Sequence, residues 1–279
     1  MIGLTPTNGN KKIVAKSVDF GTVEFANGLK LENVSLFPPI TYDNIKSVTD
    51  LSYLFAYNPN IENVVFISQG KNNISKMDYF LHNTPNLKKV IFPNMDNVTS
   101  CSRLISCDSN LPNKLEEVTI PNLPKATSTY SMLYQCRALK RATIGDMPLT
   151  KMVNFLCINC VSMTDLTIGD IGSATNVTSM LNGCSALTNL SIKKLPLVDL
   201  ANAGFDASAV LSAQSYANIF AALQQTNTPL NIKLNAAFES LTMSSTKYKA
   251  NDVELGEKTL SLTEWADLAM QKGWNIQTA

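Results

Sequence analysis

The stretch that decides the fold is Val177-Thr178-Ser179-Met180-Leu181-Asn182-Gly183-Cys184-Ser185-Ala186-Leu187-Thr188-Asn189-Leu190. Its central Met-Leu-x-x-Cys-x-x-Leu string occurs again in Ser131-Met132-Leu133-Tyr134-Gln135-Cys136-Arg137-Ala138-Leu139. In both copies the last leucine begins an apolar-x-x-apolar-x-apolar pattern, as in Leu187/Leu190/Ile192. A string that recurs in register indicates an internal repeat, and a repeat determines the whole architecture.

The apolar-x-x-apolar-x-apolar pattern occurs six times between residues 61 and 192. Its first positions are separated by 26, 28, 24, 24 and 24 residues, and a further copy, Leu31/Val34/Leu36, begins 30 residues earlier. Such self-similarity is the signature of a solenoid, and it overrides the expectation of two domains for 279 residues. The six first positions are Ile61, Leu87, Leu115, Leu139, Met163 and Leu187.

Each repeat divides into two halves. In the first half apolar residues follow helical spacing, as at Val177, Met180, Leu181 and Cys184, which predicts a short helical turn. The second half alternates apolar and polar residues like a short strand. One unit cannot bury its apolar stripe alone, so the units are expected to stack with their strands in a parallel ladder. The residues expected to cap the helical turns are Thr49, Ser75, Thr127 and Thr175.

The predicted fold is therefore an α/β solenoid, a leucine-rich-repeat-like stack with a parallel strand ladder, short helical turns and an α+β C-terminal cap. Residues 1–30 are expected to be an N-terminal cap or attachment segment, residues 31–200 the solenoid, and residues 201–279 the C-terminal capping region. The expected N-terminal strands are Ile13-Val14, Val18–Phe20 and Val23–Phe25. In the C-terminal region we expect a helix over 212–225 capped by Ser212, a strand over 230–234, a short helix, a helix capped by Thr263, and a strand at Trp274 and Ile276.

The repeat resembles the BspA-type bacterial leucine-rich repeat over about residues 31–192. It departs from that pattern at Asn58 and Thr84, which occupy the cysteine position, and at 110–113, which looks like an insertion. The segment Lys272-Gly273-Trp274 also resembles the C-terminal cap of phage-type members. The resemblance implies an extracellular or virion-borne recognition scaffold, similar to bacterial surface adhesins and to repeats of phage proteins, and it implies no catalytic residues.

The cysteines follow the repeat. Cys136, Cys160 and Cys184 recur every 24 residues, and Cys157 occupies a core position, so we interpret these thiols as small buried apolar groups. The alternative is a redox site, because Cys157-Ile158-Asn159-Cys160 matches a CxxC motif, although it lacks a strand–CxxC–helix context. Cys107 shares the register if the insertion follows it, whereas the repeat does not place Cys101.

Two outward rows on the strands are the candidate binding surface. Lys89, Glu117, Arg141 and Asp165 alternate in sign, so neighbouring strands are expected to form ion pairs. A hydroxyl row runs beside them. One hypothesis makes this face the partner-binding surface; the alternative is a solvated sheet whose charges only pair with each other. The hydroxyl row contains Thr119, Thr143 and Thr167.

Composition narrows the function. A net charge of +1 argues against a nucleic-acid partner, and a single histidine, His82, excludes zinc sites built on paired histidines. The sequence has no membrane-length apolar run, phosphate loop or dinucleotide motif. We expect no enzymatic activity, cofactor or metal, and a protein or cell-surface macromolecule as partner, within a virion or a homo-oligomeric assembly. Without a secretory signal, the expected location is a virion or cell surface; the alternative is a cytoplasmic scaffold or effector.

Overall fold

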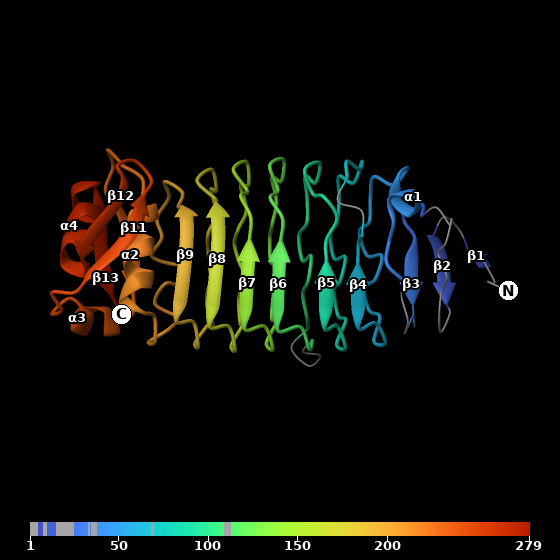
Figure 1. Cartoon of the computed structure of the whole chain (residues 1–279), viewed down its shortest axis with the longest axis horizontal. Coiled ribbons are helices and arrows are strands. Elements are labelled where there is room, and N and C mark those ends of the chain that lie inside the picture. Colours follow the sequence, from blue (N-terminus) through green and yellow to red (C-terminus); the bar gives the residue numbers. More distant parts are fainter. Residues whose placement is uncertain are drawn as a thin grey trace.

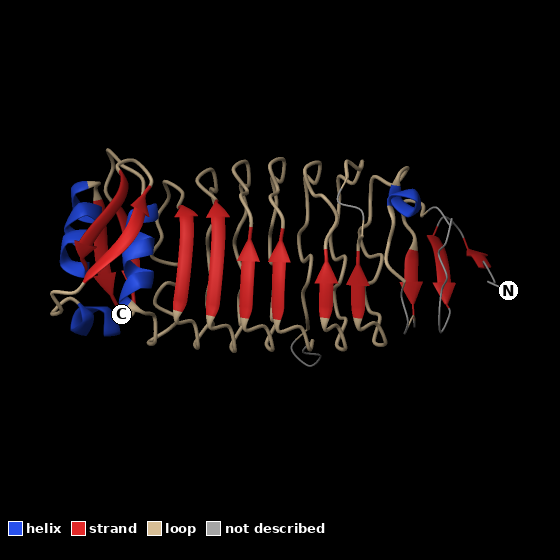
Figure 2. Cartoon of the chain, viewed as in Figure 1, coloured by secondary structure: helices blue, strands red, loops and turns tan. Residues whose placement is uncertain are grey.

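The computed structural model describes residues 5–7, 10–14, 25–32, 34, 38–67, 70–108 and 113–279. The chain forms an elongated solenoid in which strands β4 to β9 lie side by side and point in the same direction, with the two termini at opposite ends (Figure 1). Within the described ranges, helices lie only in the two end regions, and the central coils consist of strands and loops (Figure 2). The predicted solenoid with a parallel strand ladder and a C-terminal cap is confirmed.

The central strands pair in two groups. β4 (Asn63–Val65) pairs with β5 (Lys89–Ile91), and Val64 lies opposite Val90. The second group joins four strands in parallel, with Val118, Ala142, Leu166 and Leu190 side by side in register. Its strands are β6 (Glu117–Ile120), β7 (Arg141–Ile144), β8 (Asp165–Asp170) and β9 (Asn189–Lys194).

The middle apolar position of each strand forms one inward column, as the repeat predicts. The side chains of this column are all buried, with Val90 the most exposed at 8%. Each coil contributes one such residue, so the coils share a core that no single coil could shelter. The column contains Val90, Val118, Ala142, Leu166 and Leu190.

The first half of each unit differs from the prediction. Residues 177–187 form tight turns rather than a helix, and Ser179 and Gly183 have φ of 53° and 78°. Alternate amides donate to the next coil: the N–H of Ser179 bonds to the carbonyl of Asn202 at 2.7 Å, and that of Leu181 to Ala203 at 2.9 Å. A helix would use these amides internally, whereas stacking turns them along the solenoid axis. The apolar side chains still point inward.

Among the described residues, the predicted capping residues therefore cap no helix. Three of their hydroxyl groups instead donate to backbone carbonyls of the preceding coil, Ser75 to Thr49 at 2.9 Å and Thr127 to Thr99 at 3.3 Å, whereas the hydroxyl of Thr49 accepts from the side-chain amide of Asn27 at 3.0 Å. Thr175 donates in the same way to Lys151 at 3.2 Å. These hydroxyls form a second ladder along one edge of the solenoid.

All six cysteines are free and buried. The thiols of Cys160 and Cys184 donate to carbonyls of the preceding coil, those of Leu133 and Cys157, at 3.1 and 3.0 Å. Cys107 does not share their register. Its N–H bonds to the carbonyl of Tyr134 in the next coil, just as the N–H of Gln135 bonds to that of Ile158, so Cys107 is equivalent to Gln135 and lies one position before the cysteine position of Cys136. The N–H of Cys101 bonds to Ser128 as that of Met77 bonds to Ser100, so Cys101 occupies an ordinary core position.

The C-terminal cap covers the last coil. α2 (Ala213–Ala222) begins at the predicted cap Ser212 and packs on β9. α4 (Leu262–Gln271) is capped by Ser261 rather than by Thr263, because Ser261 and Glu264 form a capping box. The hairpin of β11 and β12 was not predicted. The remaining elements are β10 (Leu230–Leu234), α3 (Ala237–Leu241), β11 (Lys247–Asp252), β12 (Gly256–Ser261) and β13 (Trp274–Thr278), which pairs with β10.

At the N-terminal end a three-stranded sheet precedes the first coil. β2 pairs antiparallel with β1 and parallel with β3. Of the expected strands, Ile13-Val14 lies in β2, whereas Val18–Phe20 and most of Val23–Phe25 fall outside the described residues. The elements are β1 (Thr5–Thr7), β2 (Asn10–Val14), β3 (Lys30–Glu32) and α1 (Tyr42–Ile45).

Candidate functional site

The predicted hydroxyl row is present on the outward face of the second strand group. Thr119, Thr143, Thr167 and Ser191 stand in register on β6 to β9, and all four are exposed. Because each strand places every second residue on this face, a constant repeat length puts like side chains beside one another.

The predicted charge row is only partly paired. Glu117 and Arg141 form an ion pair between β6 and β7. Asp165 instead accepts hydrogen bonds from the hydroxyl of Thr164 at 2.6 Å and the amide of Asn189 at 2.7 Å. These two bonds lower the pKa of Asp165, and the bond from Thr164 has the larger effect.

The predicted pair between Lys89 and Glu117 is wrong, because the strand ladder is interrupted between β5 and β6. The two strands belong to separate hydrogen-bonded sheets. Ahead of the paired strands a backbone bond joins consecutive coils, as from Lys140 to Glu116 at 2.8 Å, but no such bond joins Glu116 to Lys88 among the described residues. The longest interval between the six first positions from Ile61 to Leu187, 28 residues, falls here and contains residues 110–113, where the sequence indicates an insertion.

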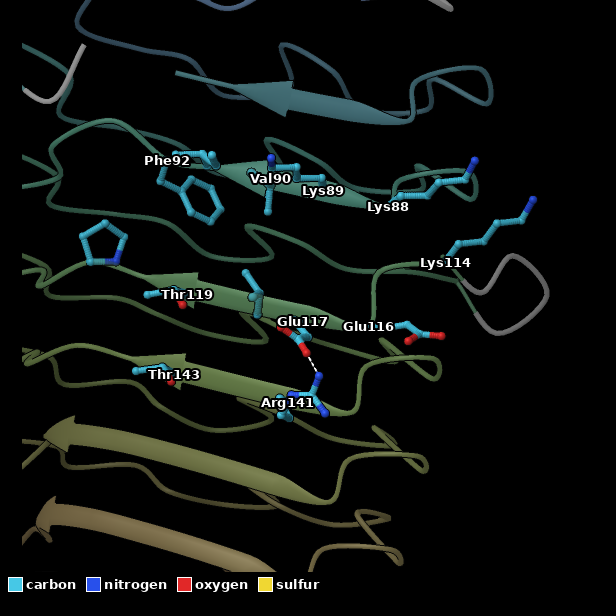
Figure 3. A pocket seen from close by; sticks show the side chains of 13 residues that line it. Lys88, Lys89, Val90, Phe92, Lys114, Glu116, Glu117, Thr119, Arg141 and Thr143 are labelled. Atoms are coloured by element: carbon cyan, nitrogen blue, oxygen red, sulfur yellow. Dashed lines mark ion pairs between the residues drawn. The ribbon is translucent and has the colours of Figure 1, made fainter. Parts of the chain in front are cut away.

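The interruption opens a groove of about 1080 Å³ on the outward face, which we call the β5–β6 groove (Figure 3). It runs along β5 and β6 and reaches β7 at Arg141 and Thr143. Five of the predicted site residues line it, whereas Asp165 and Thr167 lie further along the sheet. Its polar and charged lining residues are Lys88, Lys89, Lys114, Glu116, Glu117, Thr119, Arg141 and Thr143.

Most charges at the groove are matched. Lys88 pairs with Glu62 at 2.8 Å, and Glu116 pairs with Lys140 at 3.0 Å. The hydrogen bond from Lys88 is the main reason why the pKa of Glu62 is lowered.

Two lysines at the groove are different. The ammonium groups of Lys89 and Lys114 have no ion pair or hydrogen bond within the part of the chain that the structure describes. Sequence reasoning named Lys89 but missed Lys88 and Lys114. The signal that could have found them was the extra length of this repeat, because the 28-residue interval coincides with the interruption of the strand ladder between β5 and β6.

On the side that faces the groove, the backbone groups of β5 and β6 have no strand partner in the part of the chain that the structure describes. The N–H of Lys89 bonds to the carbonyl of Glu62, on the β4 side. Backbone groups of successive strand residues point to opposite sides, so the N–H and C=O of Val90 point toward β6. The carbonyl of Glu116 accepts from Arg141, on the β7 side, so by the same alternation the N–H and C=O groups of Glu117 and Thr119 point toward β5. These groups are open to hydrogen bonds from water or from a ligand.

A second ordered surface lies on the turn side of the coils. The rings of Tyr53 and Tyr79 stack with centroids 4.7 Å apart and planes 7° apart. The ammonium of Lys30 lies 5.3 Å from the Tyr53 centroid, and the guanidinium of Arg103 lies 5.7 Å from that of Tyr79 and 4.8 Å from that of Tyr134. Neighbouring coils thus cover each other's ring faces, so this stack stabilises the solenoid. The sequence repeat did not reveal it.

The described residues contain no group of three or more His, Cys, Asp or Glu side chains that could hold a metal ion. Within the same residues, no helix combines the length and apolar content that crossing a bilayer requires. Comparison of the chain with family models, with curated proteins and with solved structures found no match.

Proposed function

We propose that this protein is a non-enzymatic recognition protein, and that the outward face of its strand ladder binds a macromolecular partner. The observation that carries the proposal is the β5–β6 groove. On either side of it the strands satisfy each other's backbone groups, whereas the groove combines open backbone groups with two lysines that form no ion pair or side-chain hydrogen bond among the described residues. Solenoids use such extended faces for binding.

The arrangement of ionisable groups supports binding rather than catalysis. On the described outward face Glu117, Arg141 and Asp165 follow one another in a row, each on its own strand. A catalytic site needs ionisable groups that converge on one reacting atom in a sheltered pocket. The row instead offers contacts spread along a partner.

The proposed location is a virion or cell surface. The resemblance of the repeat to BspA-type repeats supports this part of the proposal. Fractionating the native source into particle, envelope and soluble material, with detection by an antibody to the chain, tests this part. We expect the protein in the particle or envelope fraction. Recovery in the soluble fraction alone would favour an intracellular scaffold.

The binding face is tested separately with purified, labelled chain added to intact cells or particles. Thr143→Trp places a bulky neutral ring on the groove wall, where it obstructs a bound partner, and is expected to reduce binding at least tenfold. Thr259→Trp is the matched control, because Thr259 is also an exposed strand threonine but lies on β12. Equal binding by both variants and the unmodified chain would exclude this face.

A further inference from the structure

We infer that the β5–β6 groove binds an extended acidic peptide segment of a partner protein. This inference rests on the proposed function, because it names the partner chemistry of the same surface. The groove is lined by four cationic side chains and two carboxylates. Both carboxylates are already paired, Glu116 with Lys140 and Glu117 with Arg141.

The excess positive charge is localised. Lys89 on β5 and Lys114 ahead of β6 both line the groove, and neither forms an ion pair or a side-chain hydrogen bond among the described residues, although Lys114 attracts Glu62 at longer range. Both side chains are exposed, so their ammonium groups can turn toward a ligand without unfolding anything. Two carboxylates on one ligand would supply the ion pairs that these two lysines lack among the described residues.

The apolar part of the lining favours a polypeptide. Val90 and Val118 form the inward column beneath the groove, and Ile91 is 39% exposed at its surface. Phe92 is the aromatic residue of the lining, and it is only 2% exposed. The described lining therefore offers no open ring face on which a sugar or a nucleobase could stack, but it does offer an aliphatic surface for side chains such as valine.

The dimensions set the length and position of the peptide. The groove follows β5 from Lys88 to Phe92, and five extended residues span about 17 Å. Cα atoms of β5 and β6 lie within 8 Å of one another, whereas a strand inserted between them would need about 9.5 Å. The peptide therefore lies along the mouth of the groove, with apolar side chains toward Ile91 and carboxylates toward Lys89 and Lys114.

The test uses the full chain and a fluorescein-labelled peptide of sequence Glu-Val-Glu-Val-Glu, with fluorescence anisotropy as the readout. A Gln-Val-Gln-Val-Gln peptide controls for shape. We expect the acidic peptide to bind, and the variant Lys89→Gln/Lys114→Gln to bind it about tenfold more weakly. The matched control Lys76→Gln/Lys247→Gln removes two exposed lysines away from the groove and should bind unchanged.

Several outcomes would overturn the inference: no binding of the acidic peptide, equal binding of the glutamine peptide, or no effect of the Lys89/Lys114 variant. Displacement of the acidic peptide by a hyaluronan fragment or single-stranded DNA at lower concentration than by unlabelled acidic peptide would assign the groove to another polyanion. Circular dichroism confirms that each variant is folded. If labelled chain still binds cells or particles while the peptide does not bind, the inference fails and the proposed function stands.

Discussion

Glu117 on β6 forms its ion pair with Arg141 on β7, and not with Lys89 on β5. Both partners are more than half exposed. The pair therefore contributes little to stability and mainly neutralises one wall of the β5–β6 groove. It also leaves Lys89 available to a ligand.

Replacing Glu117 with glutamine should change binding more than folding. Because the pair is exposed, we expect the free energy of unfolding to change by less than about 1 kcal/mol, measured by urea denaturation. Affinity for the acidic peptide should rise about threefold, because Arg141 is released and one carboxylate is lost. Glu257→Gln is the control, since Glu257 pairs with Lys249 in a similarly exposed way on the cap hairpin. A loss of peptide affinity in Glu117→Gln would contradict this role.

Close stacking of the coils should make Gly169 intolerant of a side chain. A Cβ there would lie 2.5 Å from the backbone nitrogen of Asp146 on the preceding coil. We expect Gly169→Ala to lower the free energy of unfolding by about 2 kcal/mol or more, because backbone atoms must move. In Gly256→Ala the added Cβ meets no atom within 4 Å, so only the positive φ of 77° acts, and a loss of about 1 kcal/mol is expected. Equal losses in the two variants would show that coil spacing is not the constraint.

The inward column could be predicted from the sequence because a constant interval of 24 residues fixes the register. Leu166 and Leu190 lie opposite each other for that reason. Apolar spacing alone could not distinguish a helix from successive turns. Apolar spacing shows only which side chains point inward. Whether the segment forms a helix or successive turns depends on whether a backbone amide, such as that of Leu181, bonds within its own coil or to the next coil.

The groove could not be predicted from the same pattern. A 28-residue interval shows that extra residues are present, but not whether they project outward or separate the strands. The alternation of charges along the row likewise does not show which neighbouring side chains form ion pairs. Arg141 has a carboxylate on each neighbouring strand, and the pattern does not say that it pairs with Glu117 while Asp165 bonds to Thr164 and Asn189.

The cap contains a buried ion pair that should be important for stability. The ammonium of Lys272 lies 2.6 Å from the carboxylate of Asp252, and the two side chains are 3% and 0% exposed. Lys272 also donates to the carbonyl of Leu223 at 2.7 Å. We expect Lys272→Met to lower the free energy of unfolding by about 3–5 kcal/mol, because it leaves a carboxylate buried without its counterion.

A second variant identifies the cause. Lys272→Met/Asp252→Asn removes the buried charge as well, so it should be more stable than Lys272→Met alone in urea denaturation. Lys249→Met removes one partner of an exposed pair and should stay within about 1 kcal/mol of the unmodified chain. If the double variant were the less stable of the two, loss of packing or of the turn bonds made by Asp252 would explain the effect instead.

His82 should make stability depend on pH. Its side chain is buried, its Nδ1 lies 2.8 Å from the hydroxyl of Ser106, and its Nε2 lies 3.9 Å from Asp108. Burial lowers the pKa of His82 below 6.5, and the attraction of Asp108 only partly offsets this. Below pH 6.5 the unfolded chain therefore takes up a proton before the folded chain does, so the free energy of unfolding falls as the pH drops toward the folded-state pKa. Because the chain has one histidine, its single imidazole NMR signal reports this pKa directly. In His82→Gln the loss of stability between pH 7 and 5 should be smaller, and an imidazole that titrates at or above 6.5 in the folded protein would refute the prediction.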